Sequence, residues 1–210
     1  IASIGSQVLI VSKAKLRSKE FNIVTAFINW ELFELPGINL EDIVIPVREY
    51  SHMPNADDIN NIKDEVIQSL SDLYENQYID NRDLKRIKDS ILSFKIDPFK
   101  LSLQLQGGFD LTDGCGGTQF YISPVYETII SDIEGDGNSE EATKIEKMLM
   151  GFHNTMTPDH PNPVVDISFR DYRTNDGSFV NIIDKEQFFT PEEFELADHH
   201  FQGRFDEYGQ

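Results

Sequence analysis

The chain has 210 residues, of which 39% are hydrophobic and 11% aromatic, and its formal net charge is −19 at pH 7. This length and hydrophobic content predict a folded protein with a buried core and exclude a disordered chain. The negative charge repels phosphate groups, which argues against nucleic acid and anionic membranes as partners. The chain has no run of roughly 18 apolar residues and only a single cysteine. We therefore expect a soluble, intracellular protein without an internal disulfide.

Three strands are expected near the beginning of the chain. Gln7 to Val11 is a short apolar run, and Phe21 to Leu35 is the longest stretch that favours a strand, with no Gly or Pro inside it. In this longer stretch apolar residues fall on both faces, which predicts a strand that is covered on both sides or changes faces at a bulge. Ile43 to Val47 is expected to form another short strand, interrupted by Pro46.

Between residues 55 and 94 the apolar period becomes helical. Asn55 or Asp57 can cap a first helix, and Asp80 opens a second one. The connection over residues 76–79 is short, so an antiparallel helical hairpin over 55–94 is predicted, with the apolar stripes of both helices facing the same core. The apolar residues of the first helix are Ile59, Ile62, Val66, Leu70 and Leu73.

Apolar and polar residues alternate again from Phe99 to Gln106, which predicts a strand. A second β-rich run covers Thr118 to Tyr126. The two runs predict a hairpin over residues 99–126 at the centre of the sheet. Its loop contains five glycines and Cys115, the only cysteine of the chain.

A helix is expected after residue 138, and the stretches Val164 to Phe169 and Phe179 to Ile183 indicate a second hairpin. Thr190 and Pro191 have the pattern of a helix start. Together the elements predict an α+β fold with one domain over residues 1–210. Its mostly antiparallel sheet combines the N-terminal strands and both hairpins, and the helical hairpin packs on one face.

An acidic stretch after the central hairpin has the spacing of the start of a calcium loop of the EF-hand type. The oxygen-bearing side chains are Asp132, Glu134, Asp136 and Asn138, and Gly137 holds the sixth place. The twelfth place holds Thr143 where such loops carry Glu, so an acidic turn that caps the following helix is the favoured interpretation. A calcium-stabilised binding domain is one alternative function.

The glycine-rich loop around Cys115 also allows a thiol nucleophile. His153 or His160 would act as the base, and Asp166 could orient either imidazole, so a Cys-dependent hydrolase is a second alternative. However, a strand is expected after Cys115, whereas reactive thiols commonly lie at a helix N-terminus that lowers their pKa. An incidental cysteine in a hairpin loop is therefore favoured.

Acidic residues are concentrated in the second half of the chain. Residues 1–95 carry 11 Lys and Arg against 15 Asp and Glu, and residues 96–210 carry 7 against 22. The second helix is basic, through Arg82, Lys85, Arg86 and Lys88. These cations either pair with acidic residues of the first helix or form a docking face for an acidic partner or another copy's acidic half.

A non-enzymatic role in protein interaction or assembly is the favoured function. The class includes inhibitor and immunity proteins and subunits of large particles such as phage tails. The expected partner is a protein or a second copy of the chain, without nucleic acid, membrane or cofactor, with calcium as the alternative.

Overall fold

The structure is a computed structural model of the whole chain. It describes residues 2–15, 19–105, 110–112, 116–134, 143–150, 168–171 and 178–181. The chain divides into two units, residues 1–129 and residues 130–210. Among the described residues, no helix combines the length and the apolar character needed to cross a membrane.

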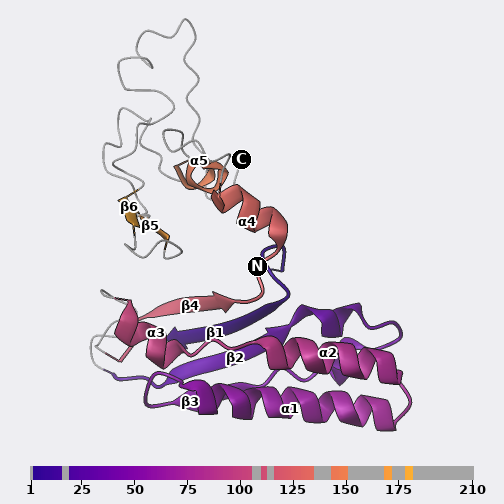
Figure 1. Cartoon of the computed structure of the whole chain (residues 1–210). Helices are drawn as coiled ribbons and strands as arrows, with labels where there is room; N and C mark the ends of the chain where they lie inside the picture. Colours follow the sequence, from indigo (N-terminus) through magenta and orange to yellow (C-terminus); the bar gives the residue numbers. More distant parts are fainter. Residues whose placement is uncertain are drawn as a thin grey trace, which may run out of the picture. The chain divides into compact units, whose positions relative to one another are not determined.

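The first unit contains a four-stranded antiparallel sheet in the order β3-β2-β1-β4 (Figure 1). The strands are β1 (Gln7–Lys13), β2 (Ile23–Asn29), β3 (Val47–Tyr50) and β4 (Gly117–Ile122). β1 lies between β2 and β4, so the first strand of the chain pairs with one that follows it by about a hundred residues. Short 3-10 helices, η1 (Trp30–Glu34) and η2 (Leu40–Asp42), connect β2 to β3.

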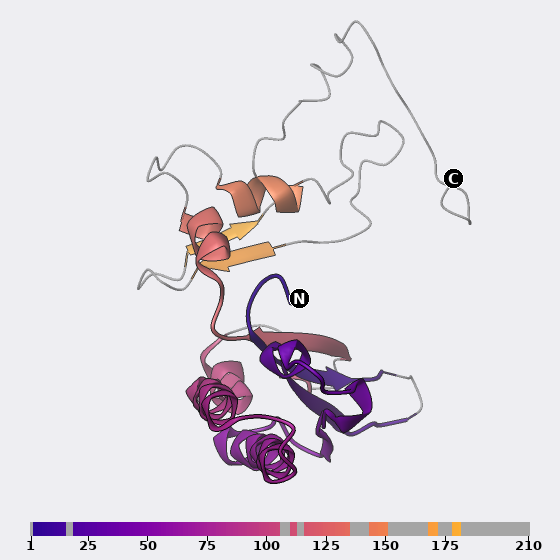
Figure 2. The ribbon, with the colours of Figure 1, turned by 90° about the vertical axis from the view of Figure 1, so that its right-hand side faces the viewer.

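Three helices separate β3 from β4, namely α1 (Ala56–Glu75), α2 (Asn81–Ser93) and α3 (Pro98–Gln104). α1 begins with a capping box in which the Asn55 side chain accepts from the backbone of Asp58, and Asp58 accepts from the Asn55 backbone N–H. The Asp80 carboxylate caps α2 by accepting from the Asp83 N–H at 2.8 Å. α1 and α2 lie side by side on one face of the sheet (Figures 1 and 2).

The core lies between this sheet face and the two long helices. Phe27 of β2 meets Phe94 at the end of α2 edge to face, with ring centroids 5.2 Å apart. One continuous buried cluster joins the strands to both helices, and its members include Leu9, Val11, Ile23, Ile59, Ile62, Val66, Leu70, Ile87 and Ile91. These helical residues recur every three or four positions, which is why α1 and α2 bury one stripe each.

The α+β class is confirmed, and so are the two helices expected within 55–94. The strand expected from Phe99 is wrong, because residues 98–104 form α3. Asp97 caps this helix by accepting from the Lys100 N–H at 2.9 Å, and Pro98 occupies its first turn. The central hairpin over 99–126 is therefore also wrong. β4 begins at Gly117, as a strand after the glycine-rich loop, and pairs with β1.

The long strand expected from Phe21 to Leu35 ends at Asn29, where η1 begins. The Asn29 side chain accepts from the Glu31 N–H at 2.9 Å and so starts the 3-10 helix. The strand expected over 43–47 is displaced as well, since β3 runs from Val47 to Tyr50 and Pro46 precedes it.

The second unit contains α4 (Glu127–Glu134), which begins in the first unit, α5 (Lys144–Met150), β5 (Ser168–Asp171) and β6 (Ser178–Asn181). β5 and β6 form the expected C-terminal hairpin, with Phe169 opposite Val180. It is a separate two-stranded sheet, so its predicted place in the main sheet is wrong. The helix start at Thr190 lies outside the described residues, and the single domain over 1–210 stays a prediction.

Candidate protein-binding surfaces

Only part of the predicted calcium loop lies in the described residues. Asp132 and Glu134 belong to the last turn of α4, and the calcium loop itself stays a prediction. Asp132 Oδ1 accepts from Lys144 Nζ of α5 at 3.1 Å, and a cation at Asp132 would have to displace this ammonium. Asp136 and Asn138 lie outside the described residues. Within the described ranges, no group of three or more His, Cys, Asp or Glu side chains could hold a metal ion.

The predicted thiol site lies outside the described residues altogether. This holds for Cys115, for His153 and His160, and for Asp166. Whether these side chains meet is therefore untested, and the Cys-dependent hydrolase stays a prediction.

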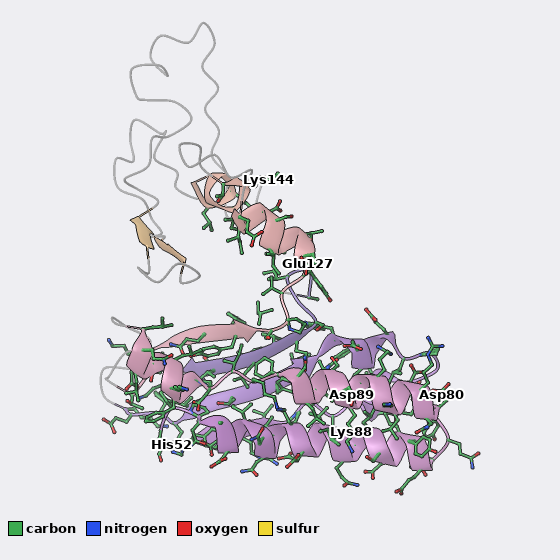
Figure 3. All side chains as sticks on the ribbon, viewed as in Figure 1. His52, Asp80, Lys88, Asp89, Glu127 and Lys144 are labelled. Carbon is green, nitrogen blue, oxygen red and sulfur yellow. The ribbon has the colours of Figure 1, made fainter. Side chains whose placement is uncertain are left out.

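A histidine and a carboxylate lie close together at the start of α1, near the end of β3 (Figure 3). His52 Nε2 is 3.1 Å from Asp58 Oδ2, and the His52 ring meets the Tyr50 ring edge to face. Burial raises the pKa of Tyr50, and the Asp58 carboxylate adds to this effect. Asp58 already serves the capping box of α1, so the pair is explained by the start of the helix.

A polar network joins α2 to the sheet. Gln7 Nε2 donates to the Ser90 carbonyl at 2.9 Å, and Asn29 Nδ2 donates to Ser90 Oγ at 3.3 Å. Ser90 Oγ in turn donates to the Glu31 carboxylate. Because Gln7 and Asn29 are buried, these bonds satisfy amide N–H groups that burial would otherwise penalise, whereas Gln7 Oε1 has no partner among the described residues. The partners of Ser90 are amides and a carboxylate, so the network positions α2 and does not form a nucleophile with its base.

Lys63 of α1 is buried between the helices. Its Nζ donates to the Phe94 carbonyl at 2.9 Å and to Asn60 Oδ1 at 3.3 Å. Burial lowers the pKa of Lys63, and the nearby Lys95 lowers it further. The bond to Phe94 satisfies a carbonyl at the end of α2, which gives this lysine a structural role.

The four predicted cations of α2 are all exposed. Arg86 pairs with Glu31 of η1 and with Asp83 of its own helix, the latter with Nη2 and Oδ1 3.2 Å apart. Within the described part of the chain, Arg82, Lys85 and Lys88 form no ion pair, neither with α1 nor elsewhere. Asp89 directly follows Lys88 on the helix (Figure 3), so the surface alternates in charge. These cations therefore offer an acidic partner only a modest attraction.

The sheet has a second face, which is turned away from α1 and α2 (Figure 2). Its side chains are largely apolar. We call this second face the open face. One row crosses all four strands in register, with Val47 opposite Ala26, Ala26 opposite Ile10 and Ile10 opposite Phe120. The exposed fractions are 53% for Val47, 49% for Phe120 and 39% for Val24. We define the open face by its exposed and half-buried side chains, which are Ile10, Ser12, Val24, Ala26, Ile28, Val47, Glu49, Thr118, Phe120 and Ile122. Val8 lies on the same side of β1 but is only 1% exposed, so the sheet is covered at that point.

The polar members of the open face lie together at one end. Ser12 and Thr118 share a hydrogen bond between their hydroxyl oxygens, 2.8 Å apart. Glu49 is the charged member, and Asn22 Nδ2 donates to its carboxylate at 3.4 Å. A shallow hollow of about 440 Å³ opens at this end of the face. Ser12 and Val24 are among the residues that line it, and none of these residues is a Cys or a His. The described surroundings of the open face thus favour contact with another surface over chemistry.

The sequence contained a signal for the open face. Apolar residues on both sides of the stretch from Phe21 predicted a strand that is covered on both sides or changes faces at a bulge. The first alternative does not hold at Val24, which is 39% exposed. The alternating positions Val24, Ala26 and Ile28 are apolar where a solvated antiparallel strand is usually polar.

Comparisons of the chain with protein-family models, with curated proteins and with solved structures find no match. The surfaces of the molecule itself are therefore the basis for its functional assignment. Of these, the open face departs most from an ordinary solvated surface.

Proposed function

We propose that the protein is a non-enzymatic protein-binding or assembly protein that binds its partner through the open face. The supporting observation is the apolar row from Val47 to Phe120, which crosses the whole sheet on the side away from the helices. Seven of the ten side chains of this face are apolar and only Glu49 is charged.

Exposing such an apolar surface to water is unfavourable for a protein that has no partner to cover it. An antiparallel sheet with one solvated face normally alternates apolar and polar residues, so that polar side chains meet water. Contiguous apolar patches on soluble proteins commonly mark contact sites, because covering them releases free energy in proportion to the apolar area buried. Phe120 is a suitable anchor, since aromatic side chains contribute strongly to interfaces.

The cations of α2 provide a weaker, separate contribution. Arg82, Lys85 and Lys88 would attract an acidic surface and speed its approach, rather than fix the bound complex. They lie on a helix that packs on the opposite face of the sheet, so the two surfaces can be altered independently.

The test compares two substitutions at exposed apolar residues. Phe120→Glu places a charge on the open face, whereas Leu103→Glu places one on α3, where Leu103 is 69% exposed. Tagged full-length chain is used to capture proteins from the source cells, including untagged copies of itself. We expect the wild type and Leu103→Glu to retain the same proteins and Phe120→Glu to lose them, with thermal unfolding confirming that all three fold.

Retention of the same proteins by Phe120→Glu would contradict the proposed role of the open face. Equal loss from both variants would also contradict it, because a charge outside the open face would then act as strongly as one on it.

A further inference from the structure

We infer that the open face binds the same face of a second copy, in a two-fold sandwich in which Phe120 of each copy covers Ala26 of the other. This inference rests on the proposed function and names its partner. It follows from the positions of one large and one small side chain around the central strand.

Phe120 and Ala26 lie symmetrically about β1. Both stand directly opposite Ile10, Phe120 on β4 and Ala26 on β2. A two-fold axis that runs along β1, between two stacked sheets, exchanges the positions of β2 and β4. The exposed Phe120 ring of one copy then lies over the small Ala26 of the other, and the two Ile10 side chains meet at the axis. A large residue facing a small one is how stacked sheets interdigitate.

One neighbouring row is already covered within the chain, since Val8, which stands between Ile28 and Ile122, is only 1% exposed. The row on the other side exchanges in the same way. Thr118 and Val24 both stand opposite Ser12 and exchange likewise. The hydroxyl groups of Ser12 and Thr118 already bond to each other within one copy. If the dimer buries these two hydroxyl groups, each therefore keeps the other as its hydrogen-bond partner.

The charged residue of the open face fixes the choice of axis. Glu49 lies on β3, the edge strand beyond β2, opposite Val24. With the axis along β1, β3 lies outside the overlap of β4, β1 and β2, and Glu49 stays in water. An axis between β1 and β2 would instead place Glu49 over Thr118 of the other copy and bury its charge. Burying an unpaired carboxylate is strongly unfavourable, so the axis along β1 is preferred.

The size of the face predicts a weak dimer. Three overlapping strands about 4.8 Å apart, each contributing about six residues at about 3.4 Å, give a footprint of about 15 by 20 Å. Counted over both copies, the buried accessible surface is on the order of 600 Å², in the range of weak and transient contacts. We therefore expect a reversible dimer with a dissociation constant of about 100 μM or more.

Sedimentation velocity of the 210-residue chain tests the inference. We expect the mass of the wild type to rise from 24.1 kDa toward twice that value as its concentration rises from about 10 μM to about 1 mM. Phe120→Ala leaves two small residues facing each other and Ala26→Phe leaves two large ones, so each should weaken dimerisation by about tenfold or more. The double variant, Phe120→Ala with Ala26→Phe, restores one large and one small residue in each pair and should recover most of the affinity. Leu103→Ala serves as the control and should dimerise like the wild type.

A wild-type chain that stays monomeric up to about millimolar concentration would overturn the inference, and so would a double variant that dimerises no better than either single variant. A dimer that persists unchanged in all variants would show that another surface pairs. If the chain is monomeric but still captures another protein in a Phe120-dependent way, the self-pairing is wrong while the proposed function stands. Phe120→Glu provides a second monomerising variant should Ala26→Phe fail to fold.

Discussion

The two faces of the four-stranded sheet are made by neighbouring residues of the same strands, yet they meet very different surroundings. Leu9, Val11 and Phe27 pack against α1 and α2 and are almost fully buried. Ile10, Ala26 and Phe120 point to the open face, where Phe120 is about half exposed. Both faces are apolar, but only one is covered by the long helices. The two faces thus share an apolar composition and differ in what covers them, and this difference is the reason for proposing that the open face binds a partner.

Substituting a phenylalanine on each face should separate them most strongly. Phe27→Ala removes a buried ring that packs on Phe94, and we expect the free energy of unfolding to fall by about 3 to 5 kcal/mol. Phe120→Ala removes a half-exposed ring and should lower the free energy of unfolding by less than about 1 kcal/mol at concentrations where the chain is monomeric. Urea denaturation measures both. Equal losses would mean that the two faces are equally buried and would remove the distinction.

Breaking the polar network that joins α2 to the sheet should have an intermediate effect on the free energy of unfolding. Asn29→Ala removes the cap of η1 and the bond to Ser90, and the loss should be about 1 to 3 kcal/mol. Asn22→Ala is the matched control, since Asn22 makes an exposed bond to Glu49 at 3.4 Å and should cost less than about 0.5 kcal/mol. An Asn29 variant as stable as the control would contradict the structural role given to this network.

The covered face should also influence stability at high pH. Burial raises the pKa of Tyr121 to about 12, and its hydroxyl donates to Gln119 Oε1 at 2.8 Å. Between pH 10 and 12 the unfolded chain releases this proton while the folded chain keeps it, so stability falls as pH rises through this window. Urea midpoints of the wild type and Tyr121→Phe should diverge there, with the variant losing less. Parallel curves for the two proteins would contradict the burial of this phenol.

The smallest effects are expected on the exposed side of α2, which carries the cations. Replacing Lys85 and Lys88 by Gln should change the free energy of unfolding by less than about 0.5 kcal/mol, because neither forms an ion pair among the described residues. Arg86→Gln breaks the pairs with Glu31 and Asp83 and should cost up to about 1 kcal/mol. Loss of several kcal/mol in the double Lys variant would show that these cations belong to the core structure.

Local patterns predicted the elements whose signals agree with one another. Between residues 55 and 94 the helical period, the caps at Asn55 and Asp80 and the short connection all agree, and both helices are present. From Phe99 the alternation predicted a strand, but Asp97 caps a helix that begins at Pro98, and the helix prevails because its cap bond forms locally. The pairing of β4 with β1 joins distant stretches, and no local pattern specifies such a contact.

The apolar residues of the open face were predicted, but their exposure was not. The apolar positions on both sides of β2 were recognised, but the strand was expected to be covered on both sides or to change faces at a bulge. Which face of the sheet is covered depends on where α1 and α2 pack, and these two helices pack on one face only (Figures 1 and 2). The cations of α2 were correctly placed on a helix, whereas their ion pairs with α1 were not found; Arg86 instead pairs with Glu31 and Asp83.

The salt dependence of dimerisation tests the central claim most directly. Each copy carries a net charge of −19, so two copies repel each other, and an apolar interface should strengthen when salt screens that repulsion. Sedimentation of the wild-type chain at about 50 and about 500 mM NaCl, where the Debye length shortens severalfold, should therefore give a lower dissociation constant at high salt. A dimer that dissociates on adding salt would contradict the account, because charged groups such as those of α2 would then hold the copies together.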